Sequence, residues 1–519
     1  MGVLQGCKPR PEVLEGDLSD AIFAADFGDL IAGKSPDVYG KPATFFRNTY
    51  PAAALKKIVG SVFQTLATPD GPGATIRLST GFGGGKTHTL MTLWHLAENI
   101  GNTSVGTEVL PAAGRPKKVC VAAIDASKAG VPQFGIRDGV EIHSLWGDLF
   151  FKFRGKEGLK ILGKADDPES SPSDDQLDKA FPEGPVLILL DEIVVYMAKL
   201  SERGQGNLLG FVNMLLRAVS KRPQTAFVIT DPGGQVSYAT QAGQLSQLIA
   251  AATKLNDVLS RTVSDSDPIG DEGARVIVRR LFDKVDSASA QKASALYHEL
   301  YKRVAKDHPT LLPTEATTAD YAKKIVEWYP FHPRLIKTAQ GRLDELKDFQ
   351  RSRGVLRLFA RILRDVWDEK PDIDIITAGD IDWGSSRIIA DLISRLQRDK
   401  LQSAISSDVL GHGVELDAGT RGVHYRVAAA VMYESIPLTA SSGLDIDDLT
   451  LATLRPDEAG TEPSEALDRL VGVCWHTYPM PGGKGFQFRI EPNVIKPVSY
   501  THLRAHETKA NLVCRLLLE

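Results

Sequence analysis

The chain has 519 residues, of which 43% are hydrophobic and 24% charged, and its formal net charge at pH 7 is -4. This composition is typical of a globular protein long enough for about two to four domains. The slightly acidic balance excludes a global basic field, so contact with nucleic acid would need a local patch or a partner chain.

The cysteines and the termini narrow the class further. The four cysteines stand apart, without paired spacing or histidines at ligand distance, which argues against a zinc site or a disulfide framework. The N-terminus has no apolar signal segment, and no apolar run is long enough to span a bilayer. We therefore expect a cytoplasmic protein without a membrane partner.

Residues 46–267 alternate strand-like and helix-like runs. A β-rich run from Ala74 leads through a glycine cluster into a helical pattern, and further strand-like runs follow at Lys117–Ser127, at Val186–Leu190 and in TAFVIT. The run Val186–Leu190 is apolar throughout, as expected for a strand buried on both faces. The alternation predicts an α/β fold with a parallel sheet between helices, on which residues 1–45 pack as an N-terminal segment.

The patterning changes after Pro268. Residues 268–370 read as helices and predict a helical lid. Residues 371–496 mix helices with WHTYPMPGGKGFQFRIEP, whose glycines between two β-rich arms predict a hairpin, and we expect a winged-helix-like α+β region there. Residues 497–519 resemble translated sequencing-adapter read-through, so we expect a non-native tail behind a truncated winged-helix-like region.

The stretch STGFGGGKTHTL has the features of a phosphate-binding loop between a strand and a helix. Glycines keep side chains away, so that consecutive backbone N–H groups can surround phosphate oxygens, and the helix dipole adds positive potential. Lys86 would contact the β- and γ-phosphates, and the hydroxyl of Thr87 would bind Mg²⁺. The predicted nucleotide-binding residues are Thr80, Gly81, Phe82, Gly83, Gly84, Gly85, Lys86, Thr87 and His88.

The interpretation of this loop leaves alternatives open. Thr80 stands where the pattern G-x-x-x-x-G-K-[S/T] has its first glycine, which would shift the turn without removing the glycine cluster. A glycine-rich hairpin with a chance GKT is the other interpretation. His88 could equally have a structural role.

An acidic pair follows the buried strand. Asp191 would hold Mg²⁺ through water, and Glu192 would act as the general base toward the attacking water. The pair could instead cap the following helix. An N-K-x-D element selective for guanine is absent, so the predicted cofactors are ATP and Mg²⁺.

A threonine and one of three arginines could complete a hydrolytic site. Thr230 would orient the water against the γ-phosphate, or it is an ordinary residue at a strand end. Arg261 follows a predicted helix, where AAA-type ATPases carry an arginine finger that acts on a neighbouring subunit; a surface arginine at a helix end is the alternative. Arg279 and Arg280 are rival candidates for the finger.

Arg334 lies in the first turn of a helix that begins at Pro333. It could be a lid sensor that contacts the γ-phosphate, or a solvated helix arginine. The neighbouring His332 is expected to be a packed loop residue.

Several of these segments together resemble a known family. GFGGGKTHTL, LLDEI, YPFHPRLI and FQRSRGVLRLFARIL are similar to the AAA-like ATPases of the domain-of-unknown-function 499 family, and the similarity runs from Pro11 to Lys496. The resemblance implies a P-loop NTPase fold and assigns the loop lysine and threonine to Lys86 and Thr87, and the acidic pair to Asp191 and Glu192. It also implies a prokaryotic anti-phage or restriction-like role beside DNA methyltransferases and helicases.

We therefore predict a Mg²⁺-dependent ATPase that is the motor or switch subunit of such a complex. It would act as a homo-oligomer or within a larger assembly, and direct contact with DNA stays open. A nucleotide-gated scaffold with little turnover, and a DNA translocase or helicase, are the alternatives.

Overall fold

The computed structural model describes residues 2–15, 23, 25–79, 85–231, 245–259, 264–266, 272–344, 346, 349, 351–439, 441–481 and 484–493. The chain divides into two compact units. The sheet unit is Ala21–Val276, and the helical unit joins Met1–Asp20 to Ile277–Glu519. Within the described residues, no helix combines the length and the apolar character needed to cross a membrane.

The sheet unit is built on parallel strands. The four neighbouring strands are β2 (Ala74–Ser79), β3 (Cys120–Asp125), β6 (Val186–Asp191) and β7 (Thr225–Asp231). The short β8 (Ser264–Ser266) pairs with β2 at the edge. The order is β3-β6-β7-β2-β8, and every pair is parallel. The predicted α/β fold with a parallel sheet is confirmed.

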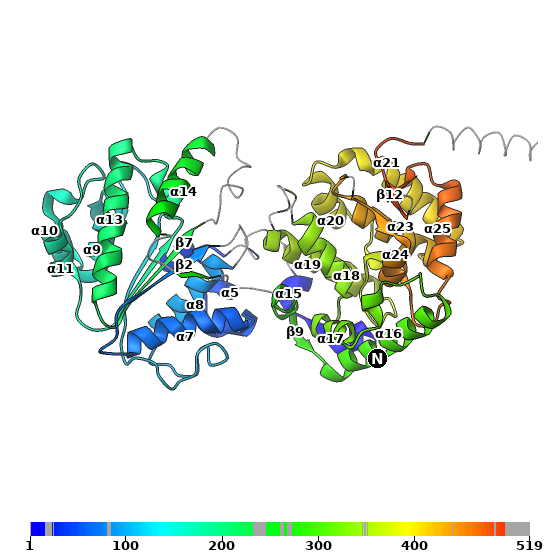
Figure 1. Ribbon diagram of the computed structural model, residues 1–519, viewed down its shortest axis with the longest axis horizontal. Coiled ribbons are helices and arrows are strands. Elements are labelled where there is room, and N and C mark those ends of the chain that lie inside the picture. Colours follow the sequence, from blue (N-terminus) through cyan, green and yellow to red (C-terminus); the bar gives the residue numbers. More distant parts are fainter. Residues whose placement is uncertain are drawn as a thin grey trace, which may run out of the picture. The chain divides into compact units, whose positions relative to one another are not determined.

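Helices cover both faces of this sheet (Figure 1). One face carries α7 (Ala53–Ala67) and α8 (Lys86–Glu98), in a core that includes Leu187 and Leu189 of β6. The other face carries α9 (Leu145–Arg154), α13 (Glu202–Lys221) and α14 (Leu245–Leu259), in a core that includes Ile188 and Leu190. Alternate residues of β6 thus enter opposite cores, which explains why its sequence is apolar without interruption.

Shorter elements complete the sheet unit. They are α4 (Phe27–Ile31), α5 (Asp37–Gly40), α6 (Pro42–Asn48), β4 (Gly135–Arg137), β5 (Val140–Ile142), α10 (Lys156–Leu162), α11 (Asp174–Ala180) and α12 (Ile193–Met197).

The expected N-terminal segment 1–45 is divided between the two units. α1 (Val3–Gly6), β1 (Cys7–Pro9) and α2 (Pro11–Leu14) belong to the helical unit, where β1 pairs antiparallel with β9 (Phe282–Val285). Arg10 fixes this pairing, because its Nε and Nη2 donate to the carbonyl oxygen of Arg279 at 3.3 and 3.0 Å. The expectation that all of residues 1–45 pack on the sheet is therefore corrected for residues 2–15.

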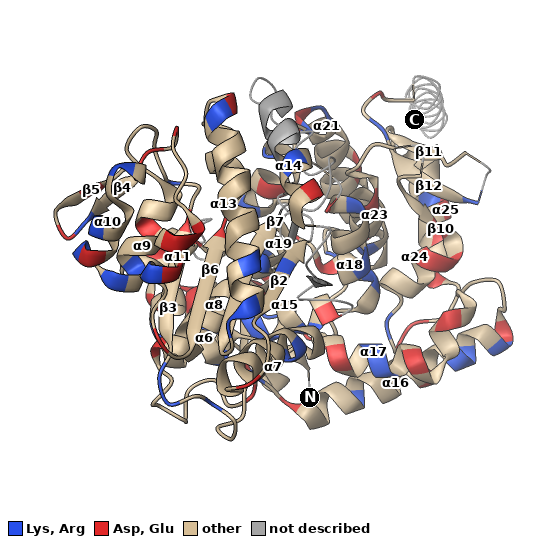
Figure 2. Ribbon diagram, turned by 60° about the vertical axis from the view of Figure 1, so that its left-hand side comes forward, with Lys and Arg blue, Asp and Glu red and all other residues tan. Residues whose placement is uncertain are grey.

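The helical unit is formed mainly by helices between residues 287 and 473. The longer ones are α16 (Ser287–Asp307), α17 (Ala319–Trp328), α19 (Arg351–Glu369) and α23 (Val423–Ser435). Figure 2 shows acidic and basic residues interspersed along α16 and α17. The shorter helices are α18 (Pro333–Thr338), α20 (Ser386–Ile389), α21 (Gln402–Ala404) and α22 (Val414–Leu416), and α15 (Gly273–Leu281) crosses the boundary between the units.

A small antiparallel sheet completes the helical unit. After α23 come β10 (Leu444–Asp445), α24 (Ile446–Thr453), α25 (Glu462–Val473), β11 (Thr477–Pro479) and β12 (Gly485–Phe488), with strand order β10-β12-β11. The predicted hairpin is confirmed, because β11 pairs antiparallel with β12. The expected lid (268–370) and winged-helix-like region (371–496) lie almost wholly within this one compact unit, and residues 497–519 lie outside the described residues.

Candidate functional site

The connections that follow the neighbouring strands β2 and β7 lead to opposite faces of the sheet. The chain leaves β2 through α8, which packs on one face, and leaves the neighbouring β7 toward α14, which packs on the opposite face. In open α/β sheets, ligands bind beyond the carboxyl ends of the strands at such a switch point. The candidate site is therefore the carboxyl edge of β2, β6 and β7.

The described part of the glycine loop is the start of α8. Gly85 precedes the helix with φ of +77°, a left-handed conformation that glycine adopts without strain, and Lys86 and Thr87 begin the first turn. Lys86 is 8% exposed. The predicted residues Thr80, Gly81, Phe82, Gly83 and Gly84 lie outside the described residues.

Asp191 and Thr230 form the centre of the site. The hydroxyl of Thr230 donates to Oδ1 of Asp191 at 2.6 Å, and the hydroxyl oxygen of Thr230 accepts the backbone N–H of Glu192 at 3.1 Å. The contact is possible because β7 lies directly beside β6, with Ile229 paired to Leu190. Both side chains are 2% exposed. Thr230 was expected to orient a water molecule, but its hydroxyl hydrogen is directed to Asp191.

Asp191 is a carboxyl group that is easily protonated. Burial, helped by the nearby charges of Glu192 and Asp125, raises its pKa from the ordinary 3.8 to about 7. Hydrogen bonds from Thr230 and Thr87 act in the opposite direction. Thr87, at the first turn of α8, and Asp191, at the end of β6, therefore lie together, and their sharing of an ion stays a prediction.

These oxygen donors fit a magnesium ion bound with a nucleotide. Among the described residues, no group of three His, Cys, Asp or Glu side chains could hold a metal ion. Mg²⁺ needs no such group when phosphate oxygens and water complete its coordination, because one or two protein ligands are then enough. A positive ion beside Asp191 would also favour its ionised form.

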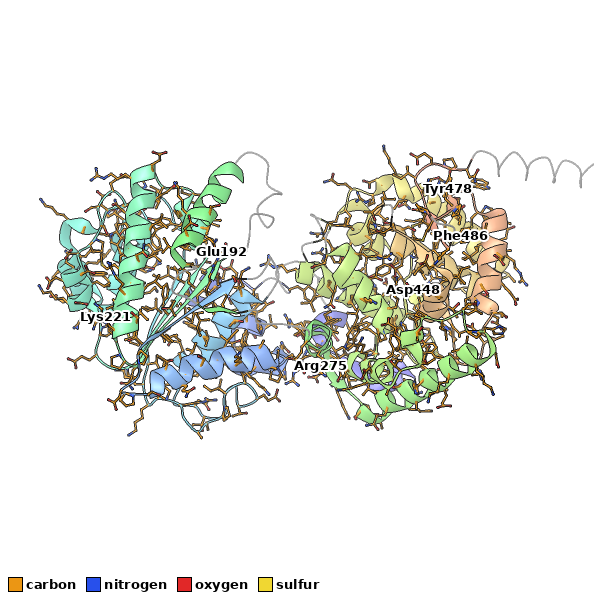
Figure 3. All side chains as sticks on the ribbon, in the orientation of Figure 1. Glu192, Lys221, Arg275, Asp448, Tyr478 and Phe486 are labelled. Atoms are coloured by element: carbon orange, nitrogen blue, oxygen red, sulfur yellow. The ribbon has the colours of Figure 1, made fainter. Side chains whose placement is uncertain are left out.

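Glu192 has an unusual backbone conformation. Its φ and ψ are +53° and +35°, in the left-handed region that costs a residue other than glycine about 1–3 kcal/mol. The hydrogen bond from its N–H to Thr230 holds this conformation. Figure 3 shows Glu192 at the edge of the sheet, and its side chain is half-buried. The sharp turn directs the chain away from β6 immediately after the buried Asp191.

Two models of known protein-family domains match the chain. The model of the DUF499 N-terminal domain matches residues 2–265, and the model of the DUF499 second domain matches residues 269–430. The chain belongs to the DUF499 family. A comparison with curated proteins finds no match.

One acidic residue of this DUF499 protein was missed by the sequence analysis. Asp125 ends β3 and pairs in register with Asp191, and it accepts the N–H groups of Gly28 at 3.1 Å and Ser127 at 2.9 Å. The run CVAAID carries the same signal as LILLD, an apolar strand that ends in aspartate. The carboxylate thereby fastens α4 of the N-terminal segment to the carboxyl edge.

His88 is packed beneath the N-terminal segment. Its ring stacks on Phe45 with centroids 4.6 Å apart, and its Nε2 lies 2.9 Å from the hydroxyl oxygen of Thr49. This is the arrangement expected for a structural role.

The predicted arginines are not part of the described carboxyl edge. Arg261 lies outside the described residues, and Arg279 and Arg280 end α15, near the first residues of the chain. Arg334 lies in the helical unit, 8% exposed, with Nε 2.8 Å from Glu434 and Nη1 2.7 Å from Asp448. The proposed sensor role stays a prediction, and it would require this guanidinium to leave carboxylates that already bind it.

Arg334→Ala should destabilise the helical unit by up to about 5 kcal/mol, because the buried Glu434 loses one of its two arginine partners, keeping Arg342, and the half-buried Asp448 loses its ion pair with Arg334. Lys337→Ala on the same helix removes an exposed pair and should cost at most about 1 kcal/mol. Hydrogen exchange of peptides from α18 and α23 measures both. Unchanged exchange in Arg334→Ala together with lost ATP turnover would favour the sensor role instead.

Asp191→Asn should stabilise the nucleotide-free sheet unit above pH 7 and have little effect near pH 4. A carboxyl whose pKa is raised by folding opposes folding when it ionises, so the cost is absent below about pH 4 and complete above about pH 7. The upper bound of this cost to the free energy of unfolding is roughly 4 kcal/mol. Hydrogen exchange of β6 and β7 at pH 4 and pH 8 tests this, with the exposed Asp178→Asn as control. A loss of protection at both pH values would contradict it.

Proposed function

We propose that the protein binds ATP together with Mg²⁺ and hydrolyses it to ADP and phosphate at the carboxyl edge of the sheet. The observation that carries the proposal is the hydrogen-bonded arrangement of Thr87, Asp191, Thr230 and Glu192 beside the first turn of α8. A lysine and a helix N-terminus can bind the phosphates, and a threonine and an aspartate can hold the metal ion, as in known sites of phosphoryl transfer.

Each residue has a distinct role in this proposal. Lys86 and the N–H groups at the start of α8 bind the phosphates. Thr87 and Asp191 would hold Mg²⁺, which neutralises negative charge on the phosphate oxygens. Glu192 accepts a proton from the water that attacks the γ-phosphorus. Thr230 keeps Asp191 and the Glu192 backbone in position, and we assign it no direct contact with the water.

The finer fold class belongs to the same proposal. A parallel sheet with a phosphate-binding loop after β2 and an acidic pair after β6 supports an AAA-like P-loop NTPase core. The order α23, β10, α24, α25, β11, β12, with a β10-β12-β11 sheet, supports a winged-helix region in the helical unit.

The proposed biological role is that of a motor or switch in a prokaryotic anti-phage or restriction-like complex with DNA methyltransferase and helicase partners. It rests on the family resemblance. The surface of α25 favours partner proteins over direct DNA contact, because its exposed charged residues are Glu465, Asp468 and Arg469. Binding to the phosphate backbone would call for a basic surface.

Lys86→Ala should lower the affinity for Mg²⁺·ATP by about 10- to 150-fold, because a charge-assisted contact to phosphate is lost. Glu192→Gln should keep the affinity and lower turnover by about 100- to 10,000-fold, because the amide cannot accept the proton. Calorimetry measures binding, and phosphate release measures turnover.

The matched controls are the exposed Lys57→Ala and Glu202→Gln, which should leave both quantities unchanged. The assays need several protein concentrations, because a site completed by a neighbouring subunit is silent in dilute protein, and they are run with and without duplex DNA. Wild-type turnover in Glu192→Gln would remove Glu192 as the base. Tight binding with no phosphate release at any concentration would favour a nucleotide-gated scaffold. DNA-stimulated hydrolysis with strand separation would favour a helicase.

A further inference from the structure

Asn48 has a buried carboxamide without a hydrogen-bond partner. The residue is 5% exposed, and within the part of the chain that the structure describes neither its Oδ1 nor its Nδ2 is hydrogen-bonded. Buried polar side chains are nearly always paired, and a carboxamide could donate two hydrogen bonds and accept two. An amide with both ends unpaired is therefore a position where a bound molecule could supply the partners.

The position of Asn48 ties it to the first turn of α8. It is the last residue of α6, and its neighbours Phe45 and Thr49 both contact His88, which directly follows Thr87. The hydroxyl of Thr49 donates to the carbonyl oxygen of Phe45 at 2.8 Å, so His88 must donate from Nε2 to Thr49. The end of α6 is thus fastened to the turn that carries the proposed phosphate-binding residues.

Hydrogen bonds also hold the backbone that follows Asn48. The hydroxyl of Tyr50 donates to Oε1 of Glu272 at 3.1 Å and accepts from Nη1 of Arg275 at 3.1 Å. The other carboxylate oxygen of Glu272 accepts the N–H of Ala53 at 2.6 Å. The carboxamide is therefore held on a backbone anchored on both sides, which lowers the entropy cost of using it to bind a ligand.

The chemistry of a carboxamide selects one purine. Adenine presents an amino donor beside a ring-nitrogen acceptor, which Asn matches with its oxygen and its N–H group. Guanine presents two acceptors at the corresponding edge, which require two donors. We propose that Asn48 binds the base of the nucleotide whose phosphates Lys86 and Thr87 hold, and so makes the site selective for adenine. This inference rests on the proposed function.

The test compares ATP, GTP and inorganic triphosphate by calorimetry on the full chain with Mg²⁺. The wild type should prefer ATP to GTP. Asn48→Leu should weaken ATP binding by about 5- to 150-fold and leave the affinity for inorganic triphosphate unchanged, since one bidentate base contact is lost. Its thermal stability without ligand should be equal or higher, because an unpaired buried amide is replaced by an apolar group.

Two further variants complete the design. Asn48→Ser shortens the side chain and gives the same comparison if leucine does not fit. Asn207→Leu removes an amide that donates to the carbonyl oxygen of Pro168 at 3.1 Å, and it should leave the ratio of ATP to GTP affinity unchanged.

The outcomes separate this inference from the proposed function. An unchanged ratio of ATP to GTP affinity in both Asn48 variants, or equal affinities in the wild type, would overturn the role of Asn48 while leaving the phosphate site intact. A wild type that binds neither nucleotide nor inorganic triphosphate would overturn the proposed function, and the role of Asn48 with it.

Discussion

The hydrogen bond between Thr230 and Asp191 is the interaction on which the candidate site depends. It joins the ends of β6 and β7, keeps a buried carboxyl group in place, and leaves the same threonine oxygen to accept the N–H of Glu192. The strand order makes this possible, because β7 separates the strand before the glycine loop from the strand before the acidic pair. A threonine on the intervening strand can then fix the acidic groups relative to each other.

The charges at the carboxyl edge of the sheet fit an anionic ligand that binds together with a cation. Asp125, Asp191 and Glu192 concentrate negative charge at the ends of β3 and β6, and burial makes the ionised form of Asp191 unfavourable. The first turn of α8 offers backbone N–H groups and Lys86. Mg²⁺ with a nucleotide would satisfy both parts, whereas a bare anion would be repelled by the carboxylates.

Local patterns predicted much of the fold. The apolar run of β6, the helices on both faces and the hairpin of β11 and β12 follow from residue periodicity and turn composition. The division of the N-terminal segment could not be predicted in this way, because β1 pairs with a strand more than 270 residues away and no local pattern encodes the partner.

The sequence predicted part of the candidate site, as it did part of the fold. Asp191, Glu192 and Thr87 follow from motifs, and Asp125 carries a strand-end signal that could have been read. The partners of Arg334 lie 100 and 114 residues further along the chain, so no local sequence pattern could predict its ion pairs. Asn48 has no motif, and it is identified by its burial without a hydrogen bond to any residue that the structure describes.

We propose above that Thr87 and Asp191 hold the cation of a bound nucleotide. The most direct test of this proposal is calorimetric titration of ATP into the wild type and Thr87→Ala, each with Mg²⁺ and with a chelator. We expect Mg²⁺ to strengthen ATP binding to the wild type, and Thr87→Ala to lose this gain while keeping its Mg²⁺-independent affinity. Equal affinity with and without Mg²⁺ in the wild type, or an undiminished gain in Thr87→Ala, would contradict it.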